Sequence, residues 1–289
     1  MTDGDWNIAV VEDLGGGLQA GANMALRLRG RDAATDAISG ASATDGNGAR
    51  PRDSSMFLSG GFGRVFVGAI EANNANLAGV TAGGPTFLGL DSATATTGVV
   101  QAGASNSDIL QYSTPAMNGL TARVALLDNV GAGGAQAQST AQDAVLYGVN
   151  YSAGPLAMHL DWTTYGDNTA ALPRATNRLR ANANYNLGVA RVGVGYQTGD
   201  NVTAAFGAGA TQEEMLLAVS IPVGNVLLGG VYGQRTLEGV TGTATGYDLA
   251  AQYNLSKRTY VALQYRSTKQ PTAGSPTDQT TQIQFSHSF

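Results

Sequence analysis

The sequence has no cysteine, few charged residues and no long apolar run. The absence of cysteine from 289 residues excludes disulfides, thiol catalysis and thiolate metal sites. Charged residues make up only 13% of the chain, about half the usual share, so an ordinary water-exposed surface of this size is not expected. No uninterrupted apolar run reaches about 18 residues, which excludes a membrane-spanning helix. A hydrophobic share of 43% excludes a disordered polymer.

The residues that usually carry chemistry are also scarce. The net charge is −5, which argues against a nucleic-acid partner because phosphate binding needs clustered cations. Only two histidines occur, His159 and His287, so neither a Ser-His-Asp site nor a multi-histidine metal site is expected. Gly193 and Gly195 are followed by Gly199, one residue too late for a nucleotide-binding G-x-G-x-x-G loop. We therefore predict no enzyme, no catalytic residue, no cofactor and no metal.

Apolar and polar residues alternate along most of the chain. Leu156, Met158, Leu160 and Trp162 are interleaved with polar or small residues, and the pattern recurs in segments of about eight to eleven residues. A period of two is typical of a β-strand with one apolar and one polar face. No sustained helical stripe is present, so the chain is predicted to be all-β in a single domain, residues 1–289.

Short and long connections alternate between these segments. The short ones are rich in Gly, Asn and Pro and lie at 14–17, 61–63, 116–119, 153–155, 186–189, 222–224 and 254–258. The long ones cover roughly 31–53, 72–107, 128–143, 166–177, 199–212, 235–245 and 268–279. This order predicts an antiparallel object with two different ends.

The number and length of the strands favour a membrane barrel over a soluble one. About fifteen strands enclose more space than side chains can fill, so the lumen should be wet and polar. Strands of about nine to eleven residues match the tilted span of a bilayer. We therefore predict a transmembrane antiparallel β-barrel whose apolar face meets lipid.

Four motifs carry a family resemblance. They are Glu12–Leu18 (EDLGGGL), Gln111–Pro115 with Asn118–Leu120, Tyr253–Thr259 (YNLSKRT) and the terminal Phe285–Phe289 (FSHSF). With these motifs the chain resembles the general trimeric porins of the Gram-negative outer membrane over nearly its whole length. Gln111 departs from the usual Arg, and the segment 72–107 lacks an acidic P-E-F-G signature. These departures concern selectivity and leave the fold unaffected.

The resemblance implies a homotrimer of 16-stranded barrels with short turns in the periplasm. Its partners would be outer-membrane lipids, lipopolysaccharide, and small hydrophilic solutes and ions. Our count gives about fifteen strands, of which the first and last run in the same direction, whereas even strand numbers are the rule in bacterial barrels. We therefore expect this chain to lack the family's first strand and first external loop.

Charged residues on inward strand faces are the candidate pore-lining set. By strand parity the inward cations are Arg27, Arg29, Arg123, Arg180 and Arg191. The resemblance implies that the long segment 72–107 folds into the barrel as a constriction, with Asp91 in it and Glu71 and Asp108 at its base. The alternative for this segment is a mobile external loop. Contact with lipopolysaccharide phosphates or solvent is the alternative for the arginines near long-loop ends, Arg29, Arg31, Arg178 and Arg180, and also for Arg27 and Arg123.

The predicted function is passive diffusion of small hydrophilic solutes and ions through a water-filled pore in the bacterial outer membrane. Arginines outnumber acids on the inward faces, so weak anion selectivity is expected, since local charges decide selectivity in a narrow pore. The alternative is a plugged structural or adhesive barrel without channel activity.

Overall fold

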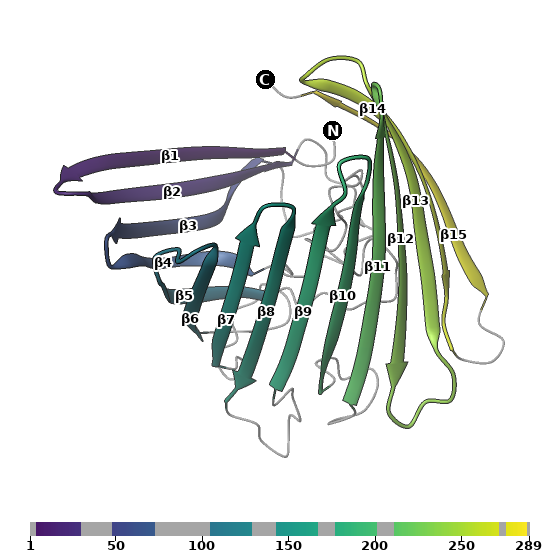
Figure 1. Cartoon of the computed structure of the whole chain (residues 1–289), viewed down its shortest axis with the longest axis horizontal. Helices are drawn as coiled ribbons and strands as arrows, with labels where there is room; N and C mark the ends of the chain where they lie inside the picture. Colours follow the sequence, from purple (N-terminus) through teal and green to yellow (C-terminus); the bar gives the residue numbers. More distant parts are fainter. Residues whose placement is uncertain are drawn as a thin grey trace.

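The chain folds into a single antiparallel sheet of fifteen strands (Figure 1). The computed structural model describes residues 4–29, 48–72, 105–128, 143–166, 177–200, 211–271 and 276–287. The strands are β1 (Gly4–Gly15), β2 (Leu18–Arg29), β3 (Gly48–Gly60), β4 (Gly63–Ala72), β5 (Ser105–Ser113), β6 (Leu120–Asp128), β7 (Ala144–Ala153), β8 (Leu156–Tyr165), β9 (Asn177–Asn186), β10 (Arg191–Asp200), β11 (Thr211–Val223), β12 (Val226–Leu237), β13 (Ala244–Asn254), β14 (Thr259–Lys269) and β15 (Thr277–His287). None of the described residues forms a helix long and apolar enough to cross a membrane.

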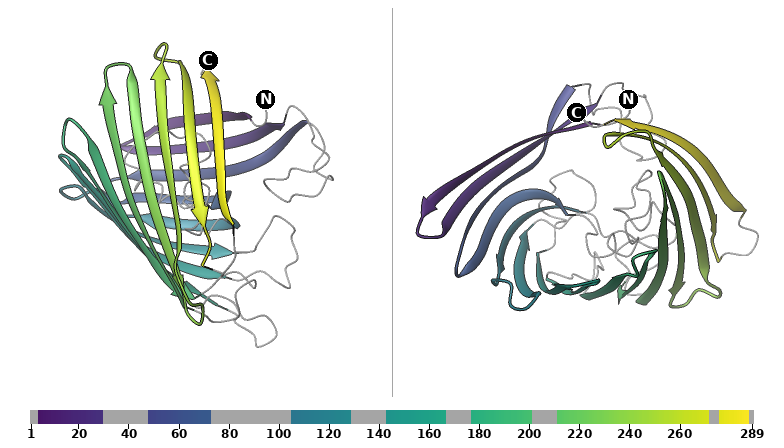
Figure 2. Two further views of the ribbon diagram at one scale, coloured as in Figure 1. Left: turned by 90° about the vertical axis from the view of Figure 1, so that its right-hand side faces the viewer. Right: turned by 45° about the horizontal axis from the view of Figure 1, so that its top comes forward.

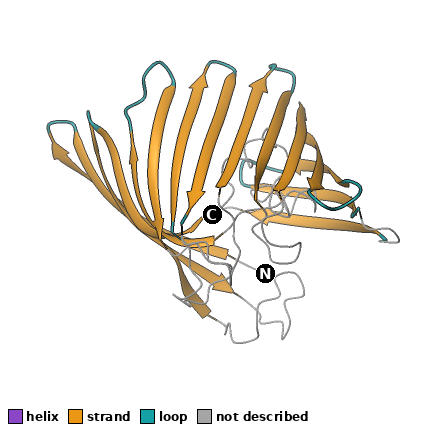
Figure 3. Cartoon of the chain, turned by 90° about the horizontal axis from the view of Figure 1, so that it is seen from below, coloured by secondary structure: helices purple, strands orange, loops and turns teal. Residues whose placement is uncertain are grey.

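Every strand pairs with its neighbours in sequence, from β1 through to β15. The short connections predicted from Gly, Asn and Pro lie between paired strands, and most of them gather along one edge of the sheet (Figure 3). The all-β antiparallel prediction is therefore confirmed. We refer to this edge as the short-turn end and to the opposite edge as the loop end.

The first turn shows why glycine is needed there. Gly15, Gly16 and Gly17 have φ values of +80°, +63° and +81°, in the left-handed region that residues with a Cβ rarely adopt. The Asp13 carboxylate accepts the N–H of Gly15 at 2.9 Å and so supports the same turn. The E-D-L-G-G-G-L motif is thus a tight link between β1 and β2.

One predicted boundary is wrong. The sequence pattern assigned 48–53 to a long connection, but these residues belong to β3. The pairing of β2 with β3 shifts register between Ala25 and Leu26, where Asp53 and Pro51 are the partners. A bulge of this kind accommodates a proline inside a strand.

The sheet curves into an open arc whose two edges are β1 and β15 (Figure 2). Within the described residues no backbone ladder joins β1 to β15. Both are odd-numbered strands of an antiparallel meander, so they run in the same direction. An antiparallel ladder between these edges would have contradicted the expectation of a missing strand, and none is present; the missing strand itself stays a prediction.

The two faces of the sheet differ in chemistry and exposure. On β11, Gln212, Glu214 and Leu216 are about 2% exposed or less, whereas the alternating Met215 and Leu217 are 46% and 52% exposed. Because the outside of a curved sheet is more accessible than its inside, the apolar set covers the convex face. The concave face carries most of the polar residues, together with some apolar ones such as Leu216.

Aromatic residues mark both ends of the convex face. Toward the loop end Tyr147 stacks on Trp162 with ring centroids 5.8 Å apart, and Tyr247 lies 6.0 Å from Tyr265. Toward the short-turn end the Tyr112 hydroxyl donates to the Phe62 carbonyl at 2.7 Å. Such belts lie at the two interfaces of a bilayer and bracket its apolar interior.

A charge on the apolar convex face should destabilise the protein according to its depth. Leu217 is at the middle of β11, so we expect Leu217→Arg to lower the free energy of unfolding from lipid vesicles by about 2–4 kcal/mol. Thr236→Arg, on the same face near the loop end of β12, should cost about 0–1 kcal/mol. Urea titrations of both variants check this, and equal losses would show that this face does not meet lipid.

Candidate functional site

A row of polar residues crosses the concave face from β6 to β12. Backbone register places Arg123, Gly148, Asp161, Arg180, Gln197, Glu214 and Arg235 opposite one another on successive strands. We call this set the inner-wall row. Neighbouring strands are about 4.8 Å apart, so the row is a continuous line of functional groups along the wall.

An ion pair spans β7 at one end of the row. The Arg123 guanidinium on β6 pairs with the Asp161 carboxylate on β8, and the Asp161 side chain is 2% exposed. Gly148 lies between them on β7, and a Cβ at this position would collide with Arg123 and with Asp161. The missing side chain of Gly148 is therefore what lets the two charged groups meet.

The middle of the row is a hydrogen-bonded chain. The Arg180 Nε donates to Oε1 of Gln197, and Gln197 Nε2 in turn donates to Oε2 of Glu214 at 2.7 Å. One strand further, Arg235 Nη2 donates to Gln270 Oε1 at 3.3 Å. Gln197 thus links an arginine to a carboxylate two strands away and fixes the position of both.

Cations exceed acids in and beside the row. Arg178 lies on the same face of β9, two residues from Arg180, and is 3% exposed. Its Nε and Nη2, together with Nη2 of Arg180, are buried and have no hydrogen-bond partner. Arg123, Arg178, Arg180 and Arg235 therefore stand against Asp161 and Glu214, and this part of the wall carries a net positive charge.

The row changes height along the wall, from the short-turn end toward the loop end. Ser113 on β5 pairs with Arg123 and also with Arg64 on β4, which extends the row to the short-turn end. Arg64 is the second residue of β4, whereas Arg235 lies near the loop end of β12. Because barrel strands tilt by about 35–45°, a row perpendicular to them forms a ramp between the two mouths.

The predicted pore-lining residues fall into three groups. Arg123 and Arg180 belong to the inner-wall row. Arg191 is on the same face but at the short-turn end of β10, where it lines a hollow of about 300 Å³ with Asn186 and Ser220. Asp108 shares the convex face of β5 with Leu110 and Tyr112, so the structure places its side chain on the face opposite the predicted pore lining.

The other predicted residues lie outside what the structure describes. Arg27, Arg29 and Glu71 belong to β2 and β4, but their side chains are not among those described. Asp91 and the rest of 73–104 are outside the described residues. The strands extend to Ala72 and resume at Ser105, so only 73–104 connects them. The constriction loop stays a prediction.

Four residues of this wall were not predicted from the sequence: Gln197, Glu214, Arg235 and Arg64. Alternation could have placed each on an inward face, but only the register between strands shows that they share a row. Over the described part of the chain, no three His, Asp or Glu side chains gather as a metal site.

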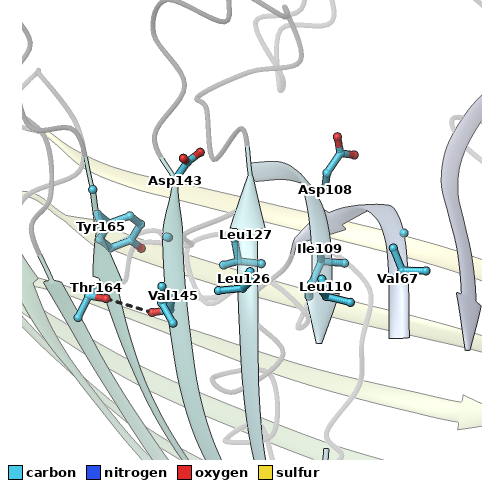
Figure 4. Close-up of a pocket in the computed structure, with 13 residues that line it drawn as sticks. Val67, Asp108, Ile109, Leu110, Leu126, Leu127, Asp143, Val145, Thr164 and Tyr165 are labelled. Atoms are coloured by element: carbon cyan, nitrogen blue, oxygen red, sulfur yellow. Dashed lines mark hydrogen bonds between the residues drawn. The ribbon is translucent and has the colours of Figure 1, made fainter. Parts of the chain in front are cut away.

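A larger hollow of about 810 Å³ lies at the loop end of β4 to β8 (Figure 4). Its lining is mostly aliphatic, with Leu110, Leu126 and Val145 among the residues, and Asp108 and Asp143 lie at its upper edge. The Thr164 hydroxyl donates to the Val145 carbonyl at 3.4 Å and so is not directed into the hollow. This hollow lacks the paired polar groups of the inner-wall row.

Comparisons with known proteins agree with this architecture. The family model described as "Gram-negative porin" matches residues 1–273. No curated protein matches the chain significantly. Among solved structures, the chain is similar to the anion-selective porin from Comamonas acidovorans, with a TM-score of 0.68, 20% identity, and coverage of 99% of this chain and 89% of that chain.

Two further structures show the same fold. OmpT of Vibrio cholerae in its trimer form gives a TM-score of 0.64 at 13% identity, covering 93% of this chain and 81% of that chain. A mutant of the Rh. blastica porin gives a TM-score of 0.60 at 14% identity, covering 92% and 84%. At these identities the similarity shows the fold alone.

The space over Gly148 can be tested by filling it. We expect Gly148→Ala to lower the free energy of unfolding by about 1–3 kcal/mol, because the new methyl group displaces Arg123 and Asp161. Gly230→Ala is the matched control: on the convex face of β12 the nearest atom to a Cβ would be the end of Leu249 at 3.3 Å, with Val219 and the Asp248 carbonyl at ordinary contact distance, and the change should stay within about 0.5 kcal/mol. Equal effects in urea titrations would show that the ion pair does not depend on this gap.

Proposed function

This chain belongs to the Gram-negative porin family, and from that premise we propose that its pore weakly favours anions. Porins are diffusion channels of the outer membrane, so the protein is a channel and not an enzyme. A plugged structural or adhesive barrel, the alternative left open by the sequence, is not what this family does. The remaining question is which solutes the pore prefers.

The inner-wall row carries the proposal. Four arginines with two acids give this part of the wall a net positive charge, which attracts anions in the lumen. The whole-chain charge of −5 has the opposite sign, but salt screens charges farther away than about 8–10 Å. In a pore the nearest charges decide selectivity. The similarity to a porin described as anion-selective agrees with this direction.

The ramp shape of the row distributes its positive charge along the pore. With Arg64 at the short-turn end, arginines are distributed from one mouth toward the other rather than gathered at a single height. An anion that leaves one guanidinium can then bind weakly to the next guanidinium along the pore. Weak binding at several sites is what conduction requires. Arg27 and Arg191 belong to the same proposal as further lumen cations.

We propose that the assembly is a homotrimer embedded among outer-membrane lipids and lipopolysaccharide. The convex face carries the small side chains Ala20 and Ala22 on β2 and Gly230 on β12, which allow close approach of a neighbouring barrel. A solved relative is described in a trimer form.

Removing row arginines should shift the selectivity. We expect the double variant Arg123→Ser/Arg180→Ser to move the zero-current potential in a KCl gradient toward potassium, because two cations leave the lumen while Glu214 stays. Arg258→Ser, in the short turn after β13, removes a cation outside the row and should leave the potential unchanged. An unchanged potential in the double variant would show that these arginines do not face the ion path.

The oligomeric state is checked separately. In mild detergent, native mass measurement and chemical crosslinking should give a species of three chains. We expect Ala22→Lys to dissociate it, because the charge replaces a small side chain at the proposed contact, while Thr236→Lys should not. A single-chain species of the unmodified protein would refute the trimer.

A further inference from the structure

A cation–aromatic cluster lies on the concave face near the short-turn end, apart from the middle of the inner-wall row. The Arg64 Cζ lies 4.3 Å from the ring centroid of Phe57 and 5.4 Å from that of Phe66. Phe57 and Phe66 are directly opposite each other on β3 and β4. Both rings therefore share one guanidinium.

Residues of the neighbouring strands β2 and β5 flank the aromatic pair. The Phe57 ring leans over β2 at Gly21, where a Cβ would collide with it. Phe66 pairs in register with Gln111 on β5. The aromatic pair is thus flanked by Gly21 on β2 and by Gln111 on β5. The two rings in turn contact the Arg64 guanidinium and restrict its position.

The Arg64 guanidinium is accessible to a ligand in the lumen. The Arg64 side chain is exposed, and no carboxylate in the described segments forms an ion pair with it. Its neighbour across the strands is Ser113, whose Oγ accepts a hydrogen bond from Gln111 Nε2 at 3.1 Å. Because that bond uses an oxygen lone pair, the Ser113 hydroxyl proton can be donated to a ligand.

We propose that Arg64, Phe57, Phe66 and Ser113 form a binding site for aromatic carboxylates at the short-turn mouth of the pore. The Ser113 hydroxyl donates to the carboxylate, the positive charge of Arg64 attracts it, and the ring of the solute stacks on the guanidinium on the side away from Phe57. The inference deepens the proposed anion-preferring pore and rests on it, since the solute must enter the lumen to reach the site.

The geometry favours a flat solute over a puckered one. The Arg64 Cζ lies over the Phe57 ring, so a second ring on the far side of the guanidinium would continue the stack. An exposed cation–π contact is worth about a two- to fivefold change in affinity. A saturated ring of the same charge and similar size keeps the carboxylate contacts and loses this one.

The experiment compares benzoate with cyclohexanecarboxylate as blockers of chloride current through the unmodified protein in a planar bilayer. Each anion is added to either side in turn. We expect benzoate to reach half-block at a two- to fivefold lower concentration, with the larger difference from the side of the short turns. Equal blocking concentrations would overturn the site.

Two variants separate this site from the pore itself. Arg64→Lys keeps the charge and lacks the planar face, so chloride preference should remain while the benzoate preference disappears. Arg258→Lys, an exposed arginine at the same end, is the matched control and should behave like the unmodified protein. A benzoate preference that survives in Arg64→Lys overturns the site, whereas a protein that forms no current overturns the pore proposal instead.

Discussion

The constraint on which this structure depends is that a backbone crossing lipid must satisfy its own hydrogen bonds. The chain meets it by pairing each strand with the next, from β1 to β15, through ladders that use nearly every residue of each strand. Pairing forces the side chains to alternate, so one face must tolerate lipid and the other water. The apolar convex face and the polar concave face both follow from that requirement.

The same ladders position the functional groups. Register brings Arg123, Asp161 and Arg180 into one line although they come from three different strands, and tilt turns that line into a ramp. Gly148 then removes a side chain where two charged groups must meet. The polar concave wall is therefore a product of strand pairing, and over the described strands its charge pattern follows from register alone.

Much of the architecture could be predicted because it depends on local patterns. The period of two along Leu156–Tyr165 and the Gly, Asn and Pro compositions of the turns are readable in one strand at a time. The predicted start of β3 was too late, since the bulge opposite Ala25 and Leu26 is not visible in sequence. Arg123 and Arg180 were identified from parity alone. Their partners Gln197 and Glu214 were not, because register depends on several strands together. Arg64 was missed because its role comes from the packing of Phe57 and Phe66 around it.

The central claim is that the wall charges of the lumen, and not the net charge of the chain, govern ion preference. The most direct measurement is the zero-current potential of the unmodified protein in a planar bilayer across a KCl gradient. The account predicts stepwise conductance and a dilute side that becomes negative, because chloride crosses more readily than potassium. A dilute side that becomes positive, or a membrane without conductance steps, would contradict it.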